Sequence, residues 1–247
     1  MTDDYLNELE QFWDEFADEY EIIQQESPFP IAEKLKQFLL QQAILPAHSF
    51  LDLAGGSGRY LAEFQDTVDH YTLVDISNEM LGIAKTKLQD SDAAFVHQDQ
   101  ERFFQSATET FDVVFTAMNP VLLTKEDLLA FTAQSHRWCL IFRLVQQTDN
   151  LFSPYEETDT KPNLMENYKQ ILKESGISYN SQDFTFTYSE EVTRDFFEAY
   201  FEKELSLKKI NQIAEKIFGL SETQLNFQTV CYQLIYYLVP DSPLVKS

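Results

Sequence analysis

The sequence predicts an α/β fold in which helices cover both faces of a doubly wound, mostly parallel sheet. From Ser49 onward, short apolar segments typical of buried strands alternate with helical segments, as right-handed βαβ crossovers require. Three of the six glycines lie between positions 55 and 58, directly after the first apolar segment. The chain has 247 residues, of which 44% are hydrophobic, and this is enough to bury the core of one such domain.

The strands expected from this alternation are short and apolar, and helical segments separate them. Ser77 and Thr124 stand where the N-cap of a helix is expected, because their hydroxyls accept hydrogen bonds from the free amides of a first turn. We expect strands at 50–54, 71–75, 93–96, 111–116 and 138–144, and helices near 58–66, 77–88, 99–107 and 124–135.

An acidic amphipathic helix is predicted before this alternation, over residues 5–21. Its apolar side chains, Phe16 and Tyr20 among them, recur at steps of three and four residues. The prolines in Ser27–Pro30 break the chain, and a second helix is expected from Ile31 to about Gln42.

After Leu144 the alternation becomes less regular. The composition shows neither a disordered linker nor an internal repeat, so one domain with a helical elaboration is the simplest architecture. Here we expect a loop at 146–159, a helix at 162–175 ended by Gly176, a strand at 183–188, helices at 190–203 and 206–218, and a strand at 230–239.

The charge balance excludes more partners than it identifies. The chain carries 18 basic and 41 acidic side chains, a net charge of -23. Such a surface repels phosphate backbones and anionic lipid headgroups, so nucleic-acid substrates are disfavoured. Cationic, neutral and small zwitterionic substrates meet no such penalty. Solubility alone also accounts for the acidity.

Features of a membrane, secreted or metal-binding protein are missing from the sequence. It has no apolar stretch approaching the roughly 18 residues that cross a bilayer and no signal-peptide pattern at its start. Cys139 and Cys231 lie far apart in apolar runs, which indicates buried free thiols and a cytoplasmic location. The four histidines show no metal-ligand spacing, so no metal site is expected.

The glycine cluster forms a loop, Asp52–Gly58, between the first strand and the helix that follows. In a doubly wound sheet this is where ligands bind, beyond the carboxyl ends of the strands. Gly56 and Gly58 allow a sharp turn and a close approach of the backbone to a ligand. The next strand ends in Asp75, whose carboxylate can accept both hydroxyls of a ribose.

The glycine register separates two classes of nucleotide cofactor. A dinucleotide fingerprint needs Gly-x-Gly-x-x-Gly, and starting from Gly56 its third glycine falls on the bulky Leu61. The pattern that fits is Asp-x-Gly-x-Gly-x-Gly from Asp52, with Ala54 in the first glycine position. This loop resembles motif I of the class I (Rossmann-like) S-adenosylmethionine-dependent methyltransferases.

The resemblance extends over about residues 10–144 and implies a seven-stranded sheet with S-adenosylmethionine as cofactor and S-adenosylhomocysteine as product. By position in the family, Asp75 would bind the ribose, Ile76 would pack on the adenine, and Asp99 would meet its amino group. An aromatic residue near the end of the first helix, here Tyr20, covers the cofactor in many members. The expected cofactor-binding residues are Tyr20, Asp52, Ala54, Gly55, Gly56, Gly58, Asp75, Ile76, Met80, Asp99, Gln100 and Thr116.

Several of these residues also have structural interpretations. In the alternative interpretation, Asp75 is merely an acidic residue at a helix N-terminus and Asp99 is the cap of the next helix. Tyr20 would then be a residue of the apolar core. Ala54 departs from the family pattern and is tolerable there if its φ stays negative.

Another local motif, Met118-Asn-Pro120, resembles the Asn-Pro-Pro-aromatic motif of amino-group methyltransferases. Val121 and Leu122 replace its second proline and its aromatic residue. We interpret this segment as a loop that lines the cleft rather than as evidence for nucleobase methylation.

The leading hypothesis is a methyltransferase with a small-molecule acceptor, organised as an N-terminal helical lid (1–45), a cofactor-binding core (46–145) and an acceptor-side elaboration (146–247). The rival hypotheses are a protein methyltransferase that recruits a basic partner, a cofactor-binding sensor without turnover, and an NAD-type oxidoreductase. No general base is identified; His97 and the tyrosines qualify only by residue type. The acceptor and the oligomeric state stay open.

Overall fold

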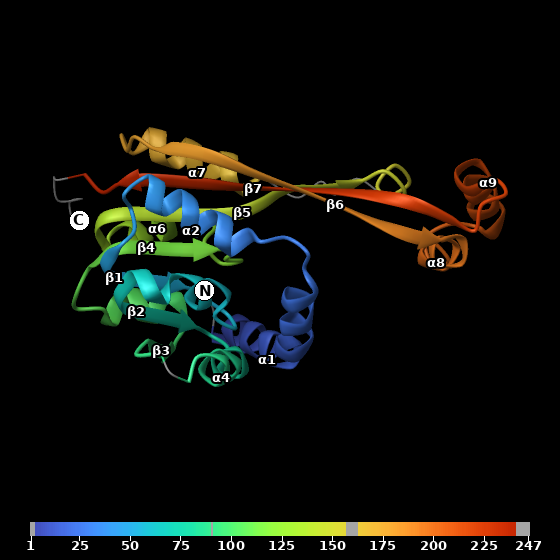
Figure 1. The fold of residues 1–247 in the computed structure, drawn as a ribbon. Coiled ribbons are helices and arrows are strands. Elements are labelled where there is room, and N and C mark those ends of the chain that lie inside the picture. The colour runs from blue at the N-terminus through green and yellow to red at the C-terminus, as the bar shows by residue number, and fades with distance from the viewer. Residues whose placement is uncertain (1–2, 90, 157–162, 241–247) are drawn as a thin grey trace. The chain divides into compact units, whose positions relative to one another are not determined.

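The computed structural model describes residues 3–89, 91–156 and 163–240 (Figure 1). The chain divides into two compact units. One comprises residues 1–143, 163–184 and 233–247, and the other comprises residues 144–162 and 185–232. The single domain expected from the sequence stays a prediction, since compactness alone does not define a domain.

A seven-stranded sheet with the strand order β3-β2-β1-β4-β5-β7-β6 runs through the fold. It is mostly parallel with one antiparallel hairpin, and neighbouring helices lie around it, so the predicted fold class is confirmed. The strands are β1 (Ala47–Leu53), β2 (Val68–Asp75), β3 (Ala94–His97), β4 (Phe111–Ala117), β5 (Ser135–Asp149), β6 (Asn180–Thr193) and β7 (Thr223–Leu238).

Strand β1 marks the point where the order of the sheet reverses. It pairs in parallel with β2 on one side and β4 on the other, and Leu53 lies level with Val74 and Thr116. The carboxyl ends of three strands therefore meet where the chain leaves β1, which is the usual ligand position in such sheets.

Helices cover both faces of the sheet in the first unit. One face packs Leu51, Val114 and Ile141 against α5, α6 and α7. The other face carries the rings of Phe50 and Phe115, which contact aromatic side chains of α3. The helices of this unit are α1 (Asp3–Glu26), α2 (Ile31–Gln41), α3 (Arg59–Phe64), the 3-10 turn η1 (Gln65–Thr67), α4 (Asn78–Lys87), α5 (Gln100–Ser106), α6 (Lys125–Thr132) and α7 (Leu164–Glu174).

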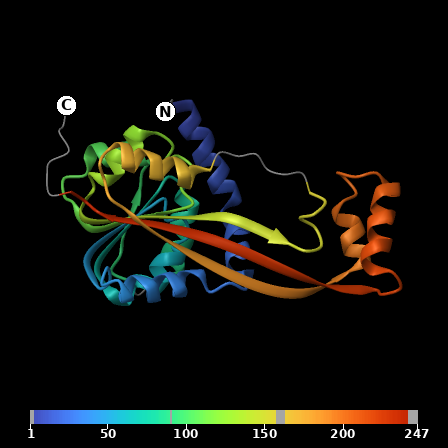
Figure 2. The same ribbon diagram turned by 90° about the horizontal axis from the view of Figure 1, so that it is seen from above.

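The second unit has an apolar core of its own. Helices α8 (Arg194–Tyr200) and α9 (Leu207–Phe218) lie side by side in both views (Figures 1 and 2). The rings of Phe152, Phe197 and Phe201 contact one another in tilted and edge-to-face arrangements, beside the buried apolar face of α9. An independent core explains why these residues form a compact unit.

Capping residues and a terminal glycine in the sequence predicted the ends of several helices correctly. The Ser77 hydroxyl accepts a hydrogen bond from the Met80 amide at the start of α4, as predicted. Thr124 forms a full capping box with Asp127 at the start of α6. Helix α7 ends before Gly176, which has the positive φ of +70° expected at a helix end.

Three boundaries in the second half were predicted wrongly. Strand β5 continues to Asp149 through residues assigned to a loop, β6 occupies positions 190–193 that were assigned to a helix, and β7 begins at Thr223 rather than near Val230. Strand pairing satisfies backbone N–H and C=O groups whatever the side chains are, so a strand can extend through polar sequence that has no apolar pattern.

No helix among the described residues is long and apolar enough to span a membrane.

Candidate cofactor site

The glycine loop leaves β1 through backbone conformations that favour glycine. Gly56 and Gly58 have φ values of +54° and +78°, as their positions in the motif predicted. Ala54 also has a positive φ, +56°, so the condition under which alanine was expected to be tolerable here is not met. The turn out of the strand requires the left-handed region here, and the methyl group of alanine is accommodated at a conformational cost.

Gly55 is required for a different reason, which is space. A Cβ atom at this position would lie 2.6 Å from Cγ of Leu73 and 3.0 Å from Cγ of Asp52. The Gly55 amide donates to the Val74 carbonyl at 3.1 Å. The loop therefore lies directly against β2.

Asp75 connects the end of β2 to this loop. Its carboxylate accepts hydrogen bonds from the Gly56 and Ser77 amides, both at 2.8 Å, and only 8% of the residue is exposed. Burial raises the pKa of this carboxyl, and backbone hydrogen bonds from Ser77, Gly56 and Ile76 oppose the rise. An ionised carboxylate has about four acceptor positions, so Asp75 keeps capacity for a ligand's hydroxyl groups.

Asp52 lies beneath the loop rather than in it. The residue is fully buried, and its carboxyl accepts a 2.8 Å hydrogen bond from the Tyr71 hydroxyl. Burial raises the pKa of Asp52 to about 7, and the negative charge of Asp75 adds to the rise. The second oxygen, Oδ1, has no hydrogen-bond partner. In this structure Asp52 supports the loop from below.

Asp99 and Gln100 follow β3 at the next strand end. Asp99 caps α5 by accepting a 2.9 Å hydrogen bond from the Arg102 amide, the structural alternative that the sequence left open. Gln100 is buried, and its Nε2 donates to the Val121 carbonyl at 3.0 Å. The carbonyl of Ile76 lies 2.8 Å from Nε2 of His97, which joins the ends of β2 and β3.

Thr116 and Met80 are both buried against the start of the loop. The Thr116 hydroxyl donates to the Leu53 carbonyl at 2.7 Å and so connects the ends of β4 and β1. The sulfur of Met80 lies 4.0 Å from the position a Cβ would take on Gly56. These two predicted site residues border the loop from β4 and α4.

Two acidic side chains of helix α1 form hydrogen bonds with the glycine loop and with the start of α4. They were not identified from the sequence as site residues. Glu21 accepts hydrogen bonds from the Ser57 hydroxyl at 2.5 Å and from the Lys87 ammonium at 2.9 Å. Asp14 accepts from the Ser77 hydroxyl at 2.6 Å and from the Glu79 amide at 3.1 Å. Asp14 and Glu21 are seven residues apart, which is about two helical turns, so they lie on the same face of α1. This spacing was the sequence signal that could have identified them.

Tyr20 belongs to an aromatic cluster on α1. Its ring lies 5.8 Å from that of Trp13 and 6.1 Å from that of Phe16, measured between centroids. The residue is half-buried and lies next to Glu21 in the sequence, so its helix turn is the one attached to the loop.

Asn119, in the loop after β4, is committed to internal hydrogen bonds. Its Nδ2 donates to Oε1 of Gln100 at 3.1 Å, and its Oδ1 accepts from the Val121 amide at 2.9 Å. Only 1% of the residue is exposed. Because both the nitrogen and the oxygen of the Asn119 amide are used in these bonds, the amide is not presented to a methyl acceptor. This agrees with our interpretation that the segment is not evidence for nucleobase methylation.

Comparison with known proteins identifies a domain in the middle of this chain. Residues 50–140 match the family model described as a methyltransferase domain. The part of the chain that resembles the class I S-adenosylmethionine-dependent methyltransferases therefore includes a methyltransferase domain. The match covers the glycine loop and the strand ends that carry Asp75 and Asp99.

Solved structures are similar to this chain at low sequence identity, and the first of them shares its fold. Precorrin 8W decarboxylase from Methanobacterium thermoautotrophicum is 12% identical, with a TM-score of 0.53 over 85% of this chain and 92% of that protein. Magnesium protoporphyrin IX methyltransferase from Synechocystis PCC 6803, solved with S-adenosylmethionine, is 14% identical, with a TM-score of 0.45 over 83% and 77% of the two chains. No curated protein matches the sequence.

A buried cysteine and the metal-ligand residue types were further candidates for reactivity among the described residues. Burial raises the pKa of the Cys139 thiol to about 12, which makes it a poor nucleophile. Within the described part of the chain, no group of three or more histidine, cysteine or carboxylate side chains could hold a metal ion.

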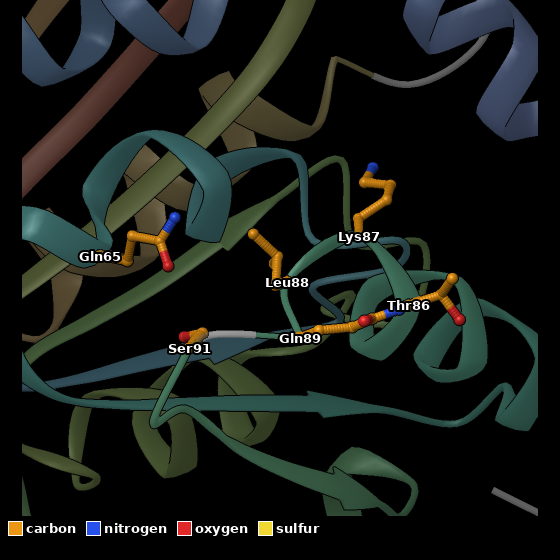
Figure 3. A pocket seen from close by; sticks show the side chains of 6 residues that line it. All are labelled: Gln65, Thr86, Lys87, Leu88, Gln89 and Ser91. Carbon is orange, nitrogen blue, oxygen red and sulfur yellow. The ribbon is translucent and has the colours of Figure 1, made fainter.

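A cavity of about 400 Å³ lies by the C-terminal end of α4 (Figure 3). This end of α4 lies beside the glycine loop, since a Cβ on Gly58 would be 3.2 Å from Cδ1 of Leu88. The cavity contains none of the predicted cofactor-binding residues. Its lining consists of Gln65, Thr86, Lys87, Leu88, Gln89 and Ser91.

Proposed function

We propose that this methyltransferase binds S-adenosylmethionine at the carboxyl ends of β1, β2 and β3 and methylates a small molecule. One observation carries the assignment: the carboxylate of Asp75 is hydrogen-bonded to the Gly56 amide. This contact brings the expected ribose acceptor and the glycine loop together, although 19 residues separate them. In the same proposal Asp99, Ile76 and Gln100 lie by the adenine, and Tyr20 and Met80 border the cofactor.

The residues present fit this cofactor. The loop has backbone amides and no Cβ atoms at Gly55, Gly56 and Gly58, so a ligand can approach its backbone closely. Asp75 retains acceptor capacity for ribose hydroxyls. Asp52 and Thr116 hold the loop in place through Tyr71 and Leu53. Ala54 adds only a methyl group at the entry to the loop.

The protein's contribution to the reaction is positioning. When bound, the cofactor supplies a methyl group that is already activated on a sulfonium, for in-line displacement by the acceptor. Asp75 and the loop would fix the orientation of that group, and α1 would exclude water by lying on Ser57 and Ser77. A general base is needed only for an acceptor that arrives protonated.

A small-molecule acceptor accords best with the charge of the chain. A net charge of -23 opposes nucleic-acid substrates. The same charge would suit a basic protein partner, so a protein methyltransferase is the second candidate function. Turnover of a metabolite pool without added protein distinguishes the two, because only the first candidate predicts it.

Calorimetric titration of the full chain with S-adenosylmethionine, S-adenosylhomocysteine and NAD tests the cofactor assignment. We expect binding of the first two and none of NAD, because Leu61 replaces the glycine of a dinucleotide site. Binding of NAD without binding of S-adenosylmethionine would refute the proposal. Cofactor binding without turnover of any acceptor would instead favour a sensor.

A further inference from the structure

An arginine in the middle of β5 stands at the acceptor side of the proposed site, level with the carboxyl end of β4. Phe142 pairs with Ala117 across β5 and β4, and Arg143 is the next residue of β5. Strand β4 in turn neighbours β1, which carries the glycine loop. Arg143 therefore lies at the same edge of the sheet as the loop, two strands away from it.

The guanidinium of Arg143 is oriented by two contacts. Its Nη1 donates to the Asn119 carbonyl at 2.7 Å. It is also hydrogen-bonded to the hydroxyl of Tyr168, which itself donates to the Leu122 carbonyl at 2.6 Å. Burial raises the pKa of Tyr168, and the positive charge of Arg143 opposes that rise. Because the guanidinium has five N–H donors, some of them stay available for a ligand.

Among the described residues, no carboxylate forms an ion pair with this charge. Arg102 and Arg194 form ion pairs with carboxylates, whereas Arg143 forms none with any described residue. The chain has 41 acidic side chains, so an arginine that forms no ion pair with a described carboxylate is unexpected. Asp127 is an acidic charge that raises the pKa of Tyr168, and its carboxylate accepts hydrogen bonds from the Leu123 and Thr124 amides. A half-buried cation without a counter-charge is costly unless a ligand supplies one.

The surroundings of Arg143 suit a ligand with an apolar part. Met118 and Leu123, in the loop after β4, are 41% and 45% exposed. The Met118 amide donates to the Phe142 carbonyl at 3.0 Å, which places this loop beside the middle of β5, next to Arg143. The same loop therefore offers exposed apolar side chains and the carbonyl that holds the arginine.

We propose that Arg143 recognises a carboxylate group on the methyl acceptor, whose apolar body lies on the loop after β4. This inference rests on the proposed function and adds the substrate class. A planar guanidinium matches a carboxylate in a two-point hydrogen-bonded pair, and one positive charge balances one carboxylate. Arg143 thus determines specificity by binding the acceptor, and the methyl group goes to another atom of it.

The test uses the full chain saturated with S-adenosylhomocysteine. Benzoate, phenylacetate and indole-3-acetate are titrated in, each beside its neutral primary amide, and binding is followed by ligand-observed NMR. The variants are Arg143→Ala, Arg143→Lys and the control Arg137→Ala, which removes an exposed arginine near the start of β5. Thermal unfolding of each variant verifies that it folds.

We expect wild type and Arg137→Ala to bind at least one acid and to bind its amide weakly. Arg143→Ala should lose about 10- to 100-fold in affinity for that acid, since a charge-assisted pair is removed, and Arg143→Lys should lose less. Affinity for S-adenosylhomocysteine should change less than about two-fold in all variants, which is roughly 0.4 kcal/mol.

Three results would overturn the inference: no acid binds the wild-type complex, amides bind as well as acids, or Arg143→Ala binds acids normally. A large loss of S-adenosylhomocysteine affinity in Arg143→Ala would also overturn it, because Arg143 would then belong to the cofactor's own carboxylate. Failure of wild type to bind either cofactor form would refute the proposed function itself. The two failures are therefore distinguishable.

Discussion

At the scale of single residues, Asp75 carries the cofactor proposal. Its carboxylate is held between the Gly56 and Ser77 amides, so its orientation is fixed before a ligand arrives. A ligand that adds ribose hydroxyls to this carboxylate finds the acceptor already desolvated and oriented. Such preorganisation makes each new hydrogen bond worth more than one to a mobile side chain.

Asp75→Ala is expected to weaken binding of S-adenosylmethionine by at least about 1.5 kcal/mol, through loss of charge-assisted hydrogen bonds. Calorimetry measures the change. Asp69→Ala is the matched control, because Asp69 lies on the same strand with an exposed side chain and should leave the affinity unchanged. Equal affinities of wild type and Asp75→Ala would refute the ribose assignment.

The backbone conformation of Ala54 affects the stability of the fold. Ala54→Gly should raise the free energy of unfolding by about 1 kcal/mol, because glycine adopts the left-handed conformation at +56° without the clash of a Cβ. Urea unfolding measures it. In contrast, Ala62→Gly, at an exposed position inside α3, should lower stability by about 1 kcal/mol. A destabilised Ala54→Gly variant would contradict the strain at this position.

At the scale of elements, α1 is attached to the site at separate points along its length. Glu10 contacts His97, Asp14 binds the start of α4, and Glu21 binds Ser57 and Lys87. Burial raises the pKa of Glu21, but hydrogen bonds from Ser57, Lys87 and Gln25 outweigh it and the net shift is downward. Glu21 therefore stays ionised at neutral pH and holds α1 to the loop.

Glu21→Ala should loosen α1 without unfolding the chain. We expect faster amide exchange in α1 and about ten-fold faster release of bound cofactor, because charge-assisted hydrogen bonds to Ser57 and Lys87 are lost. Hydrogen exchange and stopped-flow release measure these rates. Glu19→Ala, two residues away and exposed, is the control. If both variants released cofactor at the wild-type rate, α1 would not act as a lid.

At the scale of the whole molecule, stability depends on pH through buried carboxyls. The pKa of Asp52 is about 7 in the folded chain, from burial first and from the charge of Asp75, and it is 3.8 without these influences. Between these values the folded state binds more protons than the unfolded state. Asp52 therefore lowers stability as pH rises through this window, and the full penalty applies above about pH 7.

Asp52→Asn removes this titration while preserving size and a hydrogen-bond acceptor for Tyr71. The difference in unfolding free energy between the variant and wild type should move in favour of the variant from pH 5 to pH 8. Urea unfolding at the two pH values measures it. The comparison isolates Asp52 together with its interaction with Asp75, because carboxyls that do not interact with Asp52, such as Asp112, titrate alike in both proteins. A constant difference would contradict a buried titrating Asp52.

The sequence by itself determined the features that short-range physics controls. The alternation of apolar strands and helices fixed the fold class, hydroxyls at Ser77 and Thr124 fixed two helix starts, and the glycine spacing located the loop. These signals act within one turn or one strand, so local residues carry them completely. The ends of β5, β6 and β7 were missed because strand pairing with distant segments, rather than local pattern, extends them.

Only the tertiary structure decided how distant residues share the site. It placed Asp52 beneath the loop, gave Ala54 a positive φ, and joined α1 to the loop through Glu21. It also left Arg143 without a carboxylate partner among the described residues, although acids outnumber bases 41 to 18. Burial and charge compensation depend on which segments pack together, and local sequence does not encode that packing.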